Sequence, residues 1–284
     1  MPKIYHYTSI ETLALILKNK TIRFNRLDNN LDDLEEGQIS SNGVKLGNYG
    51  FVSCWTEERA ESIPLWKLYT NNGIGVRIAL EQNMFKDYIY SGIVKIGDIK
   101  FDTDSSGYNI TKTPIEDMFN SDYIVFTLLS NDYNNPSFYK TVEYVDDIDE
   151  KLKDTVKLFP KKDKNYQRIS VRHHDIGLYK KKHWEFEKET RFFLFIIPGK
   201  EMKMHKNFNI EWEQWLYDVW TKNIKNTITD YYMHLKDDVF DDMEIVLSPN
   251  CSDSNKIIVE SLCRQYAPNA KVYDSTLKNL VKIK

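Results

Sequence analysis

Three glutamates alternate with other residues just before a long hydrophobic run, in the segment HWEFEKETRFFLFIIP that begins at His183. We predict a β-strand here, in which alternate side chains share a face, so that Glu185, Glu187 and Glu189 point the same way. Arg191 continues that face and can pair with Glu189, which would keep this carboxylate ionised. Two interpretations stay open: a solvated strand end that Arg191 neutralises, or a site built around one carboxylate. For the second we favour Glu189 over Glu187.

Two other residues have side chains suited to chemistry, although each has an ordinary structural explanation. His6 lies in YHYTS, in an early predicted strand, and Tyr69 ends the predicted helix IPLWKLY, three residues after Trp66. A lone histidine in a strand is usually structural, and aromatic residues at helical spacing usually belong to the core. Together with the glutamates, however, they match a pattern that occurs in a known family.

The segments YHYTSIETLALIL, FVSCWTEERAESIPLWKLY, GIGVRIAL and KKHWEFEKETRFFL resemble a widespread bacterial family of domains of unknown function, itself similar to the ADP-ribosyltransferase fold. MEIVLSP and KVYDSTL extend the resemblance to roughly half of the chain. It implies an α+β fold with an ADP-ribosyltransferase-like split, bent β-sheet core and surrounding helices. It also implies one domain over residues 1–284, with an insertion or cap at about 102–170.

The resemblance further implies that NAD is a substrate, bound in the cleft of the split sheet. His6 would bond the nicotinamide ribose and amide, Tyr69 would stack on the nicotinamide ring, and Glu189 or Glu187 would bond the ribose hydroxyl. The residues implied to contact the dinucleotide are His6, Thr8, Arg23, Ser53, Trp55, Tyr69 and Arg191.

Several of these residues also have simpler explanations. Thr8 is explained as a helix cap, Trp55 as a core residue, and Arg23 as a solvated side chain that could alternatively bind the pyrophosphate. In the acidic loop, Asp33 and Glu36 match acidic positions of the family or only cap the following turn. This loop reads DDLEE and lacks the asparagine and proline of the family pattern.

The residue types suit cleavage of the nicotinamide–ribose bond, which develops positive charge on the sugar, as in glycoside hydrolysis. A fixed carboxylate near the sugar stabilises that charge and can orient the acceptor or take its proton. The reaction needs no metal, and the sequence offers no credible ligand cluster. We therefore predict transfer of ADP-ribose to an unknown macromolecule, and the resemblance adds the hypothesis of a toxin or phage-defence effector.

Two alternatives stay open. Transfer to water would make the protein an NAD hydrolase. A non-catalytic module for ligand or nucleic acid would use the basic stretch Lys161–Lys182, in which Tyr166 and Tyr179 are interleaved with lysines and arginines. Such a stretch is more commonly a solvated face, and it could also recruit a nucleic-acid acceptor to a transferase.

The composition limits other classes. A net charge of −3 argues against coating nucleic acid by charge alone. The cysteines, Cys54, Cys251 and Cys263, have no CxxC spacing, which fits a reducing compartment and gives no zinc signature. Cys54 could act as a nucleophile with His6, but a strand cysteine is usually a small buried hydrophobe. Because no signal peptide and no stretch of about 18 apolar residues is found, we expect a cytoplasmic protein without membrane segments.

Strands and helices mix along the whole chain, which predicts an α+β or α/β class, and these elements must position the residues. Thr8 is predicted to cap the first helix, with Glu11 three residues on. The predicted elements are a strand at 3–7, the helix after it, strands at TIRFNRL and 51–55, the helix IPLWKLY, the strand IGVRIAL, a strand pair over 88–101, helical stretches near 115–130 and 146–158, a helix through Trp212 and Trp220, and a strand–helix–strand unit from MEIVLSP through 254–266 to AKVYDS.

Overall fold

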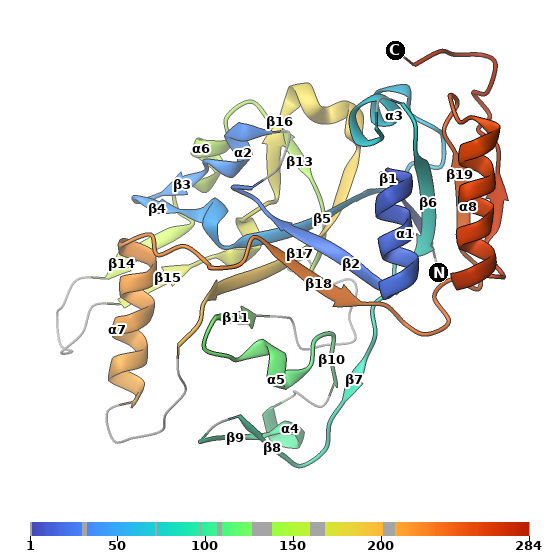
Figure 1. The fold of residues 1–284 in the computed structure, drawn as a ribbon. Helices are drawn as coiled ribbons and strands as arrows, with labels where there is room; N and C mark the ends of the chain where they lie inside the picture. Colours follow the sequence, from blue (N-terminus) through green and yellow to red (C-terminus); the bar gives the residue numbers. More distant parts are fainter. Residues whose placement is uncertain are drawn as a thin grey trace.

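The computed structural model describes residues 2–29, 33–71, 73–96, 98–106, 110–126, 138–159, 168–200 and 208–283. Within these ranges the chain is a mixed α+β structure around a ten-stranded sheet, most of whose neighbouring strands are antiparallel. Figure 1 shows α1 and α8 beside one end of the sheet and α7 at the other. Among the described residues, none of the helices has the length and apolar character needed to span a bilayer.

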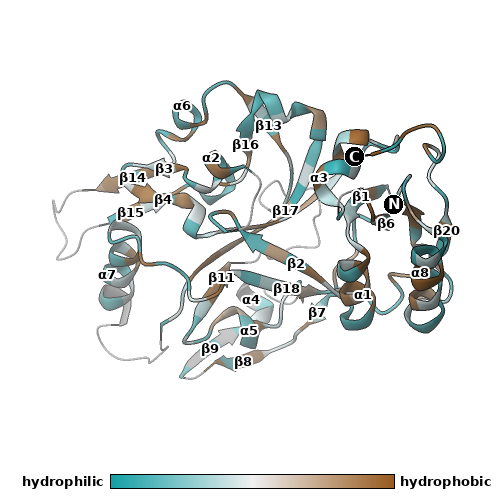
Figure 2. Ribbon diagram, turned by 45° about the horizontal axis from the view of Figure 1, so that its top comes forward, coloured by the Kyte–Doolittle hydropathy of each residue, from teal (hydrophilic) through white to brown (hydrophobic). Residues whose placement is uncertain are grey.

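The central strand is β17 (Glu189–Pro198), and every one of its residues is buried. Its apolar side chains alternate between two hydrophobic clusters, with Phe192 and Leu194 in one and Phe193 and Phe195 in the other. A strand that is covered on both faces has a nearly continuous apolar sequence, and RFFLFIIP has this pattern. Figure 2 shows this hydrophobic colouring along β17 and polar colouring over much of α7 and α8.

The sheet divides at β5 (Gly50–Thr56), which pairs with β17 along one edge. On the other edge, β1 (Lys3–Thr8) reaches only Thr56, whereas β2 (Thr21–Arg26) pairs with Val52 and Phe51. Residues 53–55 therefore lie between two diverging branches: β1 continues to β6 (Val76–Glu81), and β2 continues to β18 (Asp230–His234). The helix α1 (Ile10–Asn19) joins the branches (Figure 1).

The start of α1 corrects one prediction. Ser9, not Thr8, caps the helix, because its hydroxyl accepts the Thr12 amide at 3.1 Å. Thr8 still belongs to β1, where it pairs with Val76. The helix ends at Asn19, and Lys20 adopts the left-handed conformation that commonly follows the end of a helix.

The segment before β17 corrects a second prediction. Residues Lys182–Glu187 form the 3₁₀ helix η3, and Lys188 is left-handed with a φ of 45°. Glu185 and Glu187 therefore do not share a strand face with Glu189. The reason is that β5 ends at Thr56, opposite Glu189, so a longer strand would have no partner there.

The middle of the chain contains more strand than predicted. The strand pair over 88–101 is confirmed by β8 (Ile93–Ile96) and β9 (Ile99–Asp102). Of the stretch near 115–130 that was predicted to be helical, the structure describes residues up to 126; within these, α5 (Ile115–Met118) is helical and β11 (Tyr123–Phe126) joins the edge of β17. The helix predicted near 146–158 ends with α6 (Ile148–Leu152), because the next apolar residues pair as β14 (Val156–Phe159) with β15 (Arg168–Val171).

The predicted C-terminal unit is confirmed, and its two strands are parallel. The other elements are α2 (Leu34–Gly37), β3 (Ser40–Ser41), β4 (Val44–Lys45), η1 (Leu46–Asn48), α3 (Ile63–Tyr69), β7 (Tyr88–Ile89), α4 (Thr103–Ser106), β10 (Ile110–Thr111), β12 (Tyr139–Thr141), β13 (Glu143–Val145), η2 (His173–Asp175), β16 (Tyr179–Lys181), α7 (Phe208–Thr221), β19 (Glu244–Leu247), α8 (Asp253–Tyr266) and β20 (Lys271–Tyr273).

Candidate functional site

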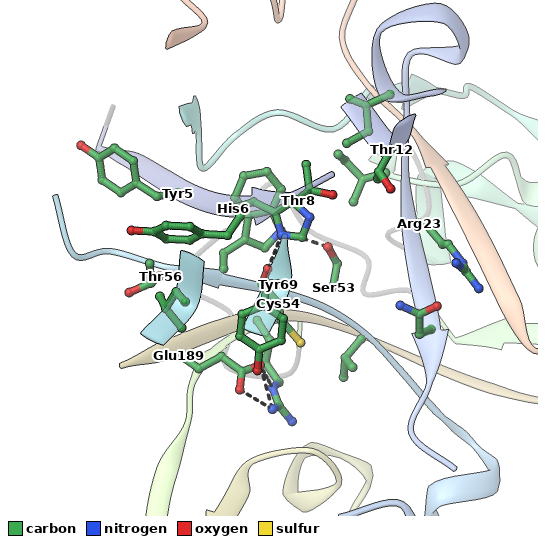
Figure 3. Close-up of a pocket in the computed structure, with 18 of the residues that line it drawn as sticks. Tyr5, His6, Thr8, Thr12, Arg23, Ser53, Cys54, Thr56, Tyr69 and Glu189 are labelled. Atoms are coloured by element: carbon green, nitrogen blue, oxygen red, sulfur yellow. Dashed lines mark hydrogen bonds and ion pairs between the residues drawn. The ribbon is translucent and has the colours of Figure 1, made fainter. Parts of the chain in front are cut away.

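A cavity of about 480 Å³ lies where the sheet divides, between β1, α1, β2, β5, α3 and the start of β17. Its volume is in the range of small-molecule sites. The residues predicted to be catalytic or to contact the dinucleotide line this cavity (Figure 3), although they are up to 185 positions apart along the chain. They are His6, Thr8, Arg23, Ser53, Trp55, Tyr69, Glu187, Glu189 and Arg191.

His6 connects β1 to the part of β5 at which the two branches of the sheet diverge. Its Nδ1 lies 2.8 Å from the backbone oxygen of Cys54, which belongs to the stretch of β5 between β1 and β2. A carbonyl oxygen only accepts, so Nδ1 carries the hydrogen. Burial lowers the pKa of His6, although the bond to Cys54 opposes this, and the ring is therefore neutral near pH 7. Its Nε2 then has a lone pair with which to accept a hydrogen bond.

Tyr69 stands at the end of α3, a helix that its own sequence defines well. Ser62 caps the helix by accepting the Leu65 amide, Pro64 lies in the first turn, and Trp66 anchors the buried face. The Tyr69 hydroxyl donates to Oε1 of Glu187. The structure thus joins two of the predicted residues directly.

Glu189 is held by a pair of parallel hydrogen bonds from Arg191, two residues along the strand. Arg191 Nε lies 2.8 Å from Oε1 and Nη2 lies 2.8 Å from Oε2, so the predicted pair is confirmed. The other side of the guanidinium bonds Glu36 and the Gly177 carbonyl. Arg191 is only 1% exposed, so this fork fixes the orientation of Glu189 within the protein interior.

Lys180 corrects the prediction for the basic stretch. The basic stretch Lys161–Lys182 was expected to be a solvated or nucleic-acid-binding face, and its residues 161–167 lie outside the described part of the chain. Lys180 is buried instead, and its Nζ donates to Glu187 Oε2 at 2.6 Å and lies 3.4 Å from Glu189 Oε2. The alternation of β16 was a usable signal, since it turns Lys180 away from the side of Tyr179 and Lys181.

Glu36 was noted in the acidic loop, but its role was not predicted. Asp33 caps α2 by accepting the amides of Glu35 and Glu36, which confirms the capping interpretation for Asp33. The Glu36 side chain is 1% exposed and pairs with Arg191, 155 residues away. No local pattern indicates a contact between such distant residues.

These side chains make a buried network with more acidic than basic groups. We call Glu36, Lys180, Glu187, Glu189 and Arg191 the charge network. Three carboxylates face two cations, so full ionisation would leave one unbalanced negative charge in the interior, which burial opposes.

Burial raises the pKa of two of the three carboxyl groups, Glu36 and Glu187, despite the cations beside them. Burial, together with the nearby charge of Glu189, raises the pKa of Glu187 to about 7, despite the opposing effect of Lys180. Burial would also raise the pKa of Glu189, but Arg191 and Lys180 outweigh it and lower this pKa to about 2. Glu189 is therefore a permanent anion at neutral pH, whereas Glu187 can gain or lose a proton.

The remaining predicted residues differ in exposure. Trp55 is 3% exposed and donates its indole hydrogen to Ser53 Oγ at 3.0 Å, so both are satisfied within β5. Thr8 is also buried. Arg23 lies at the far end of the cavity from Glu189 (Figure 3) and pairs with Asp230 at 2.6 Å, with 44% of its side chain exposed.

Cys54 does not suit the nucleophile alternative. Burial raises the pKa of its thiol well above the usual value, and the negative charge of Glu189 adds to this effect. The thiol is therefore protonated and a weak nucleophile at neutral pH. Among the described residues, no group of three or more His, Cys, Asp or Glu side chains is arranged to hold a metal ion.

Residues 65–192 match the family model described as "Protein of unknown function (DUF2971)". This match supports the resemblance to a domain of unknown function, and it includes Tyr69, Lys180 and the Glu187–Arg191 segment but not His6. Neither the comparison with curated proteins nor the comparison with solved structures gave a match.

Proposed function

We propose that the protein binds NAD in this cavity, breaks its nicotinamide–ribose bond and transfers ADP-ribose to a macromolecular acceptor. The observation that carries the proposal is the meeting of His6, Tyr69 and an ionised Glu189 in one cavity, at a division of the sheet. On this proposal the divided sheet corresponds to the split, bent core of the ADP-ribosyltransferase-like fold.

Glu189 has the properties that the bond cleavage demands. When the bond breaks, its electron pair leaves with nicotinamide, which becomes neutral, and positive charge develops on the ribose. A carboxylate that is already ionised and oriented stabilises this charge without reorganisation. Arg191 and Lys180 supply both the ionisation and the orientation of Glu189.

Glu187 is the better candidate for proton transfer. With a pKa of about 7 it is partly ionised at neutral pH, which suits a general base. It would take the proton of the acceptor as the acceptor attacks the ribose carbon. The hydrogen bonds from Tyr69 and Lys180 hold its carboxyl group in place for this step.

His6 and Tyr69 have geometries suited to holding the dinucleotide. The Nε2 of His6 accepts a hydrogen bond, so it suits a ribose hydroxyl as donor. Tyr69 lines the same cavity as Glu189 (Figure 3), and its ring offers a flat surface for nicotinamide.

The test is incubation of the purified protein with NAD labelled in the ADP-ribose part, measuring free nicotinamide and the fate of the label. We expect Glu189→Gln to lower nicotinamide release by about 100-fold or more. Glu185→Gln is the matched control, because Glu185 is an exposed glutamate four residues before Glu189, in η3. Circular dichroism and NAD binding confirm that each variant is folded.

Three outcomes are informative. Label on an added protein or nucleic acid supports transfer, whereas label only in free ADP-ribose indicates an NAD hydrolase. If folded wild-type protein neither binds NAD nor releases nicotinamide with any acceptor, the proposal is rejected in favour of a non-catalytic binding module.

A further inference from the structure

A second hollow, of about 530 Å³, lies next to the cavity, between the end of α1, the segment after β6 and the end of β18. Three of the residues that line it are lysines. We call Lys18, Lys20, Lys86, Tyr88, His234 and Asp237 the lysine hollow.

The lysine hollow carries an excess of positive charge. Lys18 and Lys86 are exposed, and Lys20 uses its Nζ to bond the backbone oxygen of Asp237 rather than a carboxylate. In the part of the chain that the structure describes, none of these three lysines forms an ion pair. Asp237 is the carboxylate among the lining residues, so three cations face one anion. The hollow therefore attracts anions, although the whole chain has a charge of −3.

The lysine hollow adjoins the cavity. Asn19 lines both spaces, and Thr21, which lines the cavity, is the cross-strand partner of His234 in the hollow. Two positions before His234, on the same face of β18, Tyr232 also lines the cavity and is 53% exposed. A polymer bound in the hollow can thus pass Tyr232 and enter the cavity.

Aromatic rings accompany the positive charges. Lys86 Nζ lies 5.8 Å from the centre of the Tyr88 ring, and Tyr232 presents a second, exposed ring toward the cavity. Phosphate binding needs only the lysines, whereas the exposed ring of Tyr232 and the half-buried ring of Tyr88 suit the stacking of unpaired bases. This combination favours single-stranded nucleic acid over an acidic protein segment.

We infer that the lysine hollow binds the phosphates of single-stranded nucleic acid and leads the strand past Tyr232 into the cavity. The role of the strand as the acceptor of ADP-ribose rests on the proposed function. In that reaction the ribose–nicotinamide bond breaks, a bond forms between the ribose carbon and a nucleophilic atom of the strand, and the proton of that atom passes to Glu187. The binding itself requires no NAD.

Binding is tested by fluorescence anisotropy with labelled 12-nucleotide oligothymidylate and oligoadenylate, without NAD and over a range of salt concentrations. We expect Lys18→Gln/Lys86→Gln to raise the Kd about tenfold and to reduce the slope of log K against log salt by about 1.4, since each phosphate contact on a single strand contributes about 0.7. Tyr232→Ala is expected to raise the Kd about fivefold or more.

The matched control is Lys67→Gln/Lys157→Gln, which removes the same charge from two exposed lysines outside the hollow. An equal loss in this control, no binding by the wild type, or preferential binding of an oligoglutamate peptide overturns the inference. Nicotinamide release without oligonucleotide binding rejects nucleic-acid binding by the lysine hollow and leaves the proposed function intact. Oligonucleotide binding through the hollow, without any NAD binding or cleavage, supports the lysine hollow as a binding site and rejects the proposed function.

Discussion

The two ends of the cavity use the same kind of interaction under opposite conditions. At the inner end, Arg191 pairs with Glu189 and Glu36, and all three side chains are almost fully buried. At the outer end, Arg23 pairs with Asp230 while 44% of its side chain is exposed. Water screens the outer pair, so it contributes little to stability, whereas the inner pair must compensate charges that have lost their hydration. Burial, rather than the pairing itself, therefore decides how strongly an arginine–carboxylate pair affects stability.

The largest expected difference between the two ends is in stability. We predict that Arg191→Met lowers the free energy of unfolding by about 3–5 kcal/mol, because two buried carboxylates lose their main cation. The matched change at the outer end, Arg23→Met, should cost less than about 1 kcal/mol. Urea denaturation of both variants measures the difference. Equal losses would show that burial does not make the inner pair more important for stability than the outer pair.

A second prediction concerns the pH dependence that the charge network produces. The pKa of Glu187 is raised to about 7 in the folded protein, from an ordinary value of about 4.5. Between these values the folded state binds more protons than the unfolded state, so stability falls as the pH rises. The loss, complete above pH 7, is up to about 3 kcal/mol, because each pKa unit corresponds to about 1.4 kcal/mol.

Glu187→Gln should remove this component, so that the free energy of unfolding changes less between pH 5 and pH 8 than in the wild type. The contribution of Glu189 to stability has the opposite pH dependence. The pKa of Glu189 is lowered to about 2, so this contribution is present above about pH 4.5 and is lost as the pH falls toward 2. Urea denaturation at each pH tests both signs, with the exposed Glu185→Gln as control. Parallel curves for wild type and Glu187→Gln would refute the assignment of the proton to Glu187.

The smallest predicted effect concerns Tyr69, which connects α3 to the charge network. Tyr69→Phe removes the hydroxyl that donates to Glu187 and should cost about 1 kcal/mol at pH 5.5, where Glu187 is protonated. The cost should rise to about 2 kcal/mol at pH 8, because hydrogen bonds to charged groups are stronger. Urea denaturation measures the loss in free energy of unfolding at both pH values. A loss that is the same at both would show that the Tyr69 hydrogen bond does not depend on the ionisation of Glu187.

Local sequence patterns predicted much of what surrounds the site. The helix predicted at IPLWKLY is confirmed as α3, with Tyr69 at its end. The period of two along β17 put Glu189 and Arg191 on one face, and the structure confirms their pair. Such features depend on neighbours a few residues away, which is why sequence reasoning finds them.

What the sequence by itself determined was therefore the local elements and the residue types of the cavity. The tertiary structure alone decided that η3 replaces the expected strand, because the partner strand β5 ends opposite Glu189. It also decided that Lys180 is buried and that Glu36 meets Arg191 across 155 residues. The ionisation of each glutamate follows from these contacts, since it depends on burial and on the sum of charges gathered in space, neither of which is encoded in a local pattern.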